Sequence, residues 1–525
     1  MKRFFSILLS SILLSSVAPI SSDALKGNFD YAVNLKNGTQ VTESTFEATD
    51  DFCQIISVSP SVNKFVDYSK GYSINYPNNL QADLSVSKLK TTLFDQNNIL
   101  EIYYDNFNNT LDTFASYTNY SNKFLHDGQG NVIDWTASTK VDGKNAKVLM
   151  WHREKLEKLP NDYNYYATAE IQRNNKEVYT IFLKSQSPIT NFNDYLVGFN
   201  MIEKKATSKI NRSFENSNRV LPKETKAFYD KYLSPSSSLK FGIFENSAPY
   251  TFDYLKTLES RMDYNFPVVV KYHTFDEKMP IWELENASKE NKVVELTLQT
   301  QESGKDNKRI TYDILNGYYD LYFKDYAKKA KEFGKPILFR LDNEMNGDWC
   351  TYSSYYTSKD TKLYIDKWKY IHNFFKEAGA DNVLFVWNPH DKSFPNFAWN
   401  NYLNYYPGDD YVDVIGITGY NNGTYYPGEV WRTFSQIYDP VYNEYSQIFK
   451  KPMMITEFAC AATGGDKALW IQDMFNNFSR YPNIKLAIWW NGIDWDSNGT
   501  PARIYKLDQD DNIIAVFKDN LKYYR

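Results

Sequence analysis

Two glutamates carry the chemistry that this sequence suggests, because each follows a short apolar run. Glu344 lies in RLDNEMNGDW (residues 340–349), and Glu457 lies in KPMMITEF (residues 451–458). Glycoside hydrolysis requires such a pair: one carboxylic acid protonates the leaving oxygen, and the other, ionised, attacks the anomeric carbon, with net retention when they are about 5–5.5 Å apart. A glutamate by itself is more often a solvated loop acid or a structural ion-pair partner, so the two side chains must meet.

Two further side chains are expected to support the ionised glutamate. Tyr420 ends another apolar run, and we expect it to donate a hydrogen bond that orients Glu457 as a nucleophile. The alternative for Tyr420 is a core or rim tyrosine. Arg340 has the strand parity of the first glutamate, so it should point into the barrel, where its charge favours the ionised form of Glu457. The alternative for Arg340 is a structural ion pair with Asp342 or Asp413.

Aromatic side chains and one histidine are candidates for lining a sugar-binding groove, because a flat apolar ring with a polar edge stacks on a pyranose. Trp489 and Trp490 end the last apolar run, and strand alternation turns one of them toward the sugar and the other outward. Trp349, Trp387 and His390 follow two earlier runs and are expected at the groove. Plain packing is the alternative for each of the three.

The elements that must position these residues form a repeating pattern. Eight apolar runs separated by helical periodicity predict a (β/α)8 barrel over residues 240–525, with the candidate residues at the carboxyl ends of its strands. A doubly wound open sheet is the competing α/β fold, but no Gly-rich phosphate loop follows the first run. The runs are residues 240–244, 267–272, 292–300, 336–341, 382–387, 412–418, 452–456 and 484–490.

Residues 52–205 predict a smaller α+β domain with an antiparallel sheet, because their strand-like pieces alternate apolar and polar side chains. One amphipathic helix is expected over residues 109–125 between these strands. The phrase FVDYSKGYSINYP (residues 65–77) resembles the start of PsbP-like domains, which implies a binding or scaffolding module. Residues 25–51 are a polar segment, and residues 206–239, rich in Lys, Asn and Ser, are expected to be a linker with a helical part at 223–232.

The first 24 residues predict an exported protein. Lys2 and Arg3 precede an apolar run, and small residues follow it, as in a secretory signal peptide; an uncleaved membrane anchor is the alternative. After cleavage no membrane association is expected. The net charge of −5 gives no cationic field for nucleic acid. Three scattered cysteines and the absence of a ligand spacing suggest neither a disulfide framework, nor a metal site, nor a cofactor.

Three ordered segments resemble glycoside hydrolase family 26, which is best known for β-mannanases. Residues 340–349 resemble its acid/base motif, residues 405–420 its approach to the sixth strand, and residues 451–458 its nucleophile strand. The resemblance covers about residues 240–524. It implies a retaining barrel hydrolase in which Glu344 is the acid/base and Glu457 the nucleophile.

Two positions depart from the family pattern. Asn343 stands where the family usually has a histidine, although Asn-Glu is the pair of the wider clan, in which the amide binds the sugar 2-hydroxyl. Gln299 lies in TLQTQ (residues 297–301), where the mannanases of the family place a substrate-binding histidine. Mannan is therefore less favoured as the substrate.

Together these features predict a secreted, retaining endo-β-glycanase. Its partner would be a polysaccharide or oligosaccharide that is mannan-like, a glucan or an exopolysaccharide, and an association with the cell wall or exopolysaccharide fits an exported enzyme. The alternative is a non-hydrolytic polysaccharide-binding or export-associated protein that keeps the barrel as a scaffold. The presence of both glutamates argues against this alternative.

Overall fold

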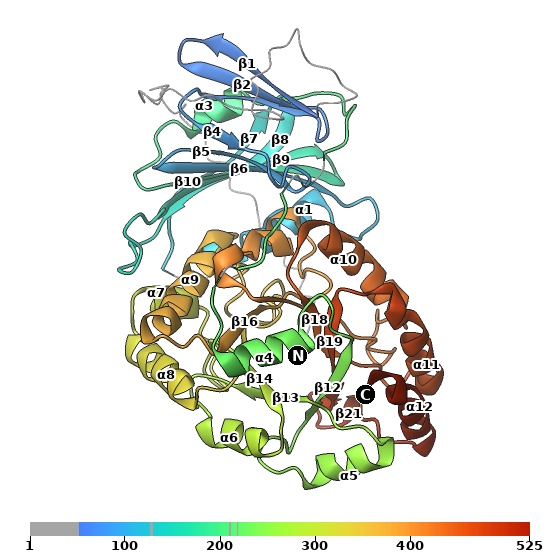
Figure 1. The fold of residues 1–525 in the computed structure, drawn as a ribbon. Coiled ribbons are helices and arrows are strands. Elements are labelled where there is room, and N and C mark those ends of the chain that lie inside the picture. Colours follow the sequence, from blue (N-terminus) through green and yellow to red (C-terminus); the bar gives the residue numbers. More distant parts are fainter. Residues whose placement is uncertain (1–51, 127–129, 209, 211, 218) are drawn as a thin grey trace.

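The computed structural model describes residues 52–126, 130–208, 210, 212–217 and 219–525. Figure 1 shows two parts: antiparallel sheets formed by the N-terminal half and, below them, a ring of helices around a barrel. The expected signal peptide and polar segment lie outside the described residues. Within the described part of the chain, no helix is both long and apolar enough to cross a membrane.

The C-terminal part is a closed barrel of eight parallel strands in chain order, which confirms the predicted (β/α)8 fold. Each of the eight apolar runs became one strand. The strands are β12 (Lys240–Glu245), β13 (Val268–His273), β14 (Val293–Leu298), β15 (Ile337–Leu341), β16 (Val383–Trp387), β17 (Val414–Thr418), β18 (Met453–Phe458) and β19 (Ile484–Asn491).

Amphipathic helices surround this barrel and bury their apolar faces against the outer side of the strands. Two of them end at glycines, because Gly334 and Gly379 adopt the left-handed conformation that closes a helix. The helices are α5 (Asp253–Met262), α6 (Ile281–Lys289), α7 (Ile310–Leu315), α8 (Asp320–Phe333), α9 (Thr361–Ala378), α10 (Phe434–Ile448), α11 (Lys467–Asn477) and α12 (Asp511–Leu521), and a hairpin of β20 (Ile493–Trp495) and β21 (Pro501–Ile504) follows β19.

The barrel interior changes from apolar to polar along its axis. At the amino-terminal end, α4 (Lys223–Tyr232) and Leu233 cover an apolar layer that includes Val268, Leu338 and Met454. The segment expected as a linker therefore contains a helix that packs against the barrel. At the carboxyl end the buried interior side chains are polar, namely Glu295, Thr297, Arg340, Asn388, Thr418 and Thr456. A polar layer at this end provides the groups that can hold charged side chains at the mouth.

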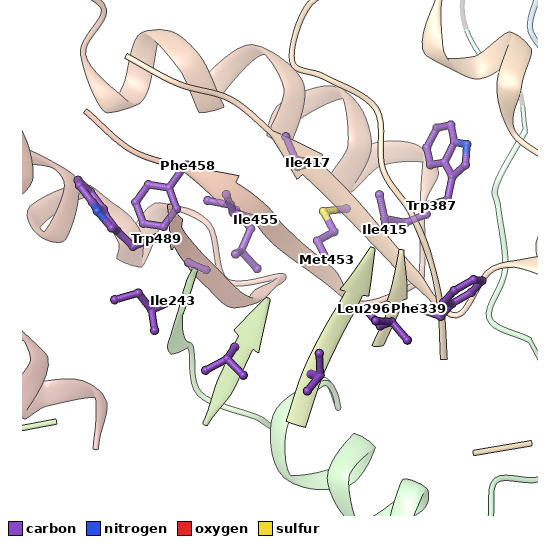
Figure 2. Close-up of a cluster of buried hydrophobic side chains, with 14 of the residues drawn as sticks. Ile243, Leu296, Phe339, Trp387, Ile415, Ile417, Met453, Ile455, Phe458 and Trp489 are labelled. Carbon is purple, nitrogen blue, oxygen red and sulfur yellow. The ribbon is translucent and has the colours of Figure 1, made fainter. Parts of the chain in front are cut away.

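A second apolar layer lies between the strands and the helices. Figure 2 shows part of it, with Phe339, Ile415, Met453 and Ile455 pointing away from the barrel axis. Inward and outward side chains alternate along every strand, so neighbours in sequence belong to different layers. This alternation decides which of the predicted aromatic residues reach the mouth.

The N-terminal part consists of two antiparallel sheets. A four-stranded sheet has the order β1-β2-β3-β11, and a seven-stranded sheet has the order β4-β5-β6-β10-β9-β8-β7. The strands are β1 (Cys53–Ser59), β2 (Val62–Asp67), β3 (Tyr72–Pro77), β4 (Gln81–Asp83), β5 (Lys90–Phe94), β6 (Asn98–Asn106), β7 (Val132–Val141), β8 (Lys144–His152), β9 (Tyr165–Asn174), β10 (Glu177–Ser185) and β11 (Asn200–Met201). With the helices described next, they confirm the predicted α+β domain with an antiparallel sheet.

The core of this domain lies between the two sheets and also includes side chains of α3 (Phe192–Val197). The single helix expected over residues 109–125 is wrong in detail: the structure has α1 (Phe114–Ser121) and α2 (Lys123–His126). Thr113 and Ser116 form a capping box that starts α1 five residues later than predicted. Asn122 separates the two helices, and its side chain binds a glutamate of the sheet instead of continuing the helix.

Candidate active site

The two candidate glutamates stand at the carboxyl ends of β15 and β18. Glu344 follows β15 by three residues, and its backbone N–H donates to the Asn388 carbonyl after β16 (2.8 Å). Asp342 and Glu344 both adopt positive φ (50° and 56°), which L-residues rarely do and which concentrates at functional sites. Glu457 lies within β18, where a register shift against β17 pairs it with Thr418. Because parallel strands of a closed barrel open on one mouth, both carboxyl groups face the same space.

Glu457 on β18 is held by two side chains from other strands of the barrel, Arg340 on β15 and Tyr420 just after β17. The Tyr420 hydroxyl donates a hydrogen bond to its Oε2 (2.7 Å), and an Arg340 guanidinium nitrogen lies 2.5 Å from its Oε1. Arg340 is fully buried and points into the barrel, where it contacts Glu457 as expected. The alternative ion pairs do not form: Asp342 pairs with Lys367 and Asp413 with Arg219.

A third carboxyl group, Glu295 on β14, lies beneath this pair and was missed by sequence reasoning. Its Oε1 is 2.9 Å from the Arg340 Nε, and both side chains are fully buried. Burial raises the pKa of Glu295 to about 8; the negative charge of Glu457 acts in the same direction, and Arg340 opposes both. Near neutral pH the Arg340 charge is therefore directed mainly toward Glu457. The signal for Glu295 was an acidic side chain in the middle of a run, residues 292–300, that is expected to form a buried strand.

Tyr272 on β13 completes the surroundings of Glu457 and was also missed. Its ring centroid lies 5.1 Å from the Arg340 guanidinium carbon, a cation–π distance. Burial raises the pKa of the Tyr272 phenol, and the carboxylate of Glu457 raises it further. Tyr272 and Tyr420 therefore both remain protonated beside Glu457, and the Tyr420 hydroxyl donates its hydrogen bond to that carboxylate.

Glu344 has a different environment from Glu457. It is half-buried, and the Trp349 indole N–H donates a hydrogen bond to its Oε2 (3.0 Å). Burial raises the pKa of Glu344 above its ordinary value; the charge on Glu457 acts in the same direction, while His390, the Trp349 N–H and Arg340 oppose it. The influence of Glu457 means that the two carboxyl groups interact across the mouth. Acid catalysis by Glu344 would need this combination: the carboxyl group of Glu344 has a raised pKa, and the neighbouring carboxyl group of Glu457 is paired with an arginine.

Replacing Trp349 with phenylalanine is expected to move the alkaline limb of the kcat/KM pH profile to higher pH. The indole N–H stabilises the ionised form of Glu344, so its loss raises the pKa of the group that must stay protonated. The measurement is initial rate against pH on a β-glycan, with Trp282→Phe, an exposed tryptophan on α6, as the control. A limb that moves to lower pH would contradict this role.

The predicted aromatic residues divide according to strand alternation. Trp490 is half-buried, stacks on Phe244 (5.1 Å between ring centroids) and lies beside Tyr420, so it belongs to the mouth. Trp489 is fully buried in the layer between strands and helices, as Figure 2 shows, and its N–H bonds the Tyr505 carbonyl. Trp489 is therefore the outward member of the pair.

The prediction of Trp387 as a groove residue needs correction. Trp387 is fully buried in the outer apolar layer, and its indole N–H donates to the Tyr405 carbonyl (3.2 Å). The last residue of β16 points outward, which its sequence position did not reveal. His390, three residues later, lies beside Trp349 with ring centroids 5.5 Å apart, so it belongs to the group around Glu344.

The two positions that depart from the family pattern meet at the mouth. The Gln299 side-chain amide donates to the Asn343 Oδ1 (3.1 Å), and the Tyr352 hydroxyl bonds the Asn343 carbonyl oxygen (2.7 Å). The Asn343 amide is thus oriented with its oxygen bound inside the protein and its NH2 group left to donate. Two departures that look independent in the sequence form one hydrogen-bonded unit in the structure.

Asp494 on β20 is a further acidic residue at the mouth. Burial raises its pKa; Arg503, whose guanidinium lies 2.8 Å from it, opposes this, and the charge on Glu457 contributes to the rise. Among the described residues, no cluster of three or more His, Cys, Asp or Glu side chains could hold a metal ion.

Fold and site together define a (β/α)8 barrel with paired glutamates at one mouth, which is the class of the barrel glycoside hydrolases. Residues 276–487, which lie within the barrel, match the family model described as Glycosyl hydrolase family 26. The match lies outside residues 52–205, so the PsbP-like resemblance of that region receives no support from it.

Two curated relatives are similar to part of the chain. Endoglucanase H of Acetivibrio thermocellus is 37% identical over 201 residues, which are 37% of this chain and 22% of that protein. The mannan endo-1,4-beta-mannosidase of Bacillus subtilis is 27% identical over 183 residues, 33% of this chain and 43% of that protein. The chain thus spans less than half the length of either relative. The solved catalytic domain of an endo-beta-1,4-mannanase from Bacillus sp. JAMB-750 aligns at 15% identity and a TM-score of 0.45, covering 59% of this chain and 92% of that chain.

Proposed function

We propose that this protein is an exported, retaining endo-β-glycanase. The observation that carries the proposal is the pair of glutamates at one barrel mouth in unlike environments. Glu457 is bound by Arg340 and Tyr420, whereas Glu344 is half-buried and has a raised pKa. Export is proposed from the basic and apolar N-terminal residues alone.

The reaction would proceed by double displacement. In the first step Glu344 gives its proton to the glycosidic oxygen while the Glu457 carboxylate attacks the anomeric carbon, so the glycosidic bond breaks and a glycosyl ester forms. In the second step the ionised Glu344 removes a proton from water, which attacks the same carbon and releases Glu457. Trp490 would stack on the sugar whose bond breaks, and the Asn343 amide would donate to its 2-hydroxyl.

We propose a β-glucan as the substrate in preference to mannan. The Gln299–Asn343 pair replaces both histidines of the mannanase pattern, so the hydroxyl recognition beside Glu344 uses amide groups. The relative with the higher identity, at 37%, is named an endoglucanase, and the mannosidase is 27% identical. Both observations favour a glucose-based chain.

A substrate screen tests this proposal. Purified protein is incubated with mixed-linkage β-glucan, cellulose, β-mannan, xylan and the host exopolysaccharide, and released reducing ends are measured. We expect activity on a β-glucan at least tenfold above that on mannan, because a site built to bond one hydroxyl pattern rejects another. Release from none, combined with binding to one, would instead favour the non-hydrolytic alternative.

A further inference from the structure

The seven-stranded N-terminal sheet has two buried faces, and the second face contacts the barrel. On β6, Leu100 and Ile102 face the core between the sheets, whereas Glu101, Tyr103 and Asp105 point the other way and are equally buried. The polar face of an antiparallel sheet is commonly solvated. Here α1, α2 and barrel loops cover it, as the position of α1 between sheet and barrel in Figure 1 indicates.

A buried ionic cluster connects this face with the loop between β15 and α9. Lys359 of the loop lies 3.3 Å from Glu170 on β9, and the Asn122 side chain donates to the same carboxylate (2.8 Å). Asp360, which caps α9, accepts from Lys184 (3.0 Å) and Tyr166 (2.9 Å). Buried charges are costly unless each is paired, so separating the domain from the loop would leave these groups unpaired. The cluster therefore fixes one docking geometry.

The same loop leads to Glu344. The Tyr120 hydroxyl on α1 donates to the Asp348 carboxylate, and the Tyr120 ring stacks on Tyr355 (4.6 Å between centroids, 23° between planes). Asp348 directly precedes Trp349, whose N–H bonds Glu344. A side chain of the N-terminal domain is thus linked to the candidate acid/base through two adjacent residues.

A second connection reaches the other side of Glu344. The backbone N–H of Ala398 donates to Asp105 (2.7 Å), and the Trp399 indole donates to Ser121 (3.1 Å). Asn400 then bonds the Asn346 carbonyl (2.9 Å), and the Asn346 side chain accepts from the His390 backbone N–H (2.8 Å). Both side chains that flank Glu344, Trp349 and His390, lie in loops anchored on the N-terminal domain.

We propose that the N-terminal domain is a structural part of the active site and that Tyr120 is a positioning residue for Glu344, acting through Asp348 and Trp349. This rests on the proposed function, because it assigns a role in the same reaction. The domain would then hold the proton donor in place and would not be a separate module on a flexible linker. None of the titratable groups that interact with Glu344 contacts Tyr120 directly. These groups are Arg340, Cys350, Tyr352, His390, Tyr420 and Glu457.

The test is Tyr120→Phe in the full-length chain, which removes the hydroxyl but keeps the stacked ring. We expect kcat to fall roughly 3- to 10-fold with KM within about twofold, because a displaced donor affects chemistry more than binding. Loosening Trp349 weakens its bond to the Glu344 carboxylate, so the alkaline limb of kcat/KM should move to higher pH, as in Trp349→Phe but by less. Tyr163→Phe is the matched control, since that hydroxyl bonds the Gln96 carbonyl within the N-terminal domain.

A second measurement does not depend on activity. Hydrogen–deuterium exchange of residues 346–358 should be faster in Tyr120→Phe than in the wild type and unchanged in Tyr163→Phe. If the wild type hydrolyses no glycan, the proposed function fails, while the exchange comparison still decides the positioning role. Unchanged exchange, or in an active enzyme an unchanged kcat and pH profile, would overturn the proposal. Lys359→Met, which leaves Glu170 without its cation, should accelerate exchange in the same loop, and failure to do so would count equally against it.

Discussion

Replacing Glu457 with alanine is expected to lower turnover of the polysaccharide by roughly 10⁴-fold or more, the scale of losing a nucleophile. The carboxylate that attacks the anomeric carbon is then absent, and neither Tyr420 nor Arg340 can replace it. Binding of oligosaccharide should be retained, because Trp490 and Asn343 do not depend on this carboxylate for their positions. Reducing-end assays and calorimetric titration with an oligosaccharide measure the two effects.

Added azide distinguishes a missing nucleophile from a misfolded protein. In Glu457→Ala, azide can occupy the vacated space and attack the anomeric carbon from that side, which gives a glycosyl azide of inverted, α configuration. Glu332→Ala, an exposed glutamate on α8, is the control and should behave as the wild type. Full hydrolytic activity of Glu457→Ala without azide would refute the assignment of the nucleophile.

Replacing Glu344 with alanine is expected to separate the two steps of the reaction. On the polysaccharide, kcat/KM should fall by about 10²- to 10⁴-fold, the usual contribution of general acid catalysis. An aryl β-glycoside with a 2,4-dinitrophenolate leaving group needs no protonation, so its first step should stay fast. The second step lacks its base, and the glycosyl-enzyme should accumulate.

The measurement for Glu344→Ala is a stopped-flow burst of dinitrophenolate equal to the enzyme concentration, followed by slow turnover. Azide should accelerate the slow phase and yield a β-glycosyl azide, the configuration opposite to that from Glu457→Ala. An α-glycosyl azide from Glu344→Ala would mean that the two glutamates have exchanged roles.

The two glutamates illustrate what could be predicted locally. Each lies at the end of an apolar run, and the number of runs separated by helices predicts a closed barrel, whose geometry brings strand ends together. The barrel was confirmed strand by strand. The catalytic roles of Glu344 and Glu457 and the substrate contacts of Trp349, His390, Asn343 and Trp490 stay predictions until the variants are assayed.

The residues that were wrongly placed or missed share one cause: the local pattern of apolar and polar residues does not report contacts between distant segments of the chain. Trp387 ends an apolar run, as a groove residue would, yet its side chain points outward from β16 into the outer apolar layer. Glu295 was missed because its partner Arg340 lies 45 positions away along the chain. The pairing of Gln299 with Asn343 was equally hidden.

Hydrophobic periodicity was enough to predict the barrel, the antiparallel N-terminal domain and the placing of the acidic residues at strand ends, because it reports burial along each element. It did not predict what covers each buried face, which became visible only in the folded molecule. Apolar and polar side chains alternate along the strands of the N-terminal sheet, as if the polar face met water. That face is instead covered by α1, α2 and barrel loops, and Glu170, Lys184 and Tyr120 make the contacts with these loops. Alternation shows that a side chain points to one face, but the partner of that face is set by packing between segments hundreds of residues apart.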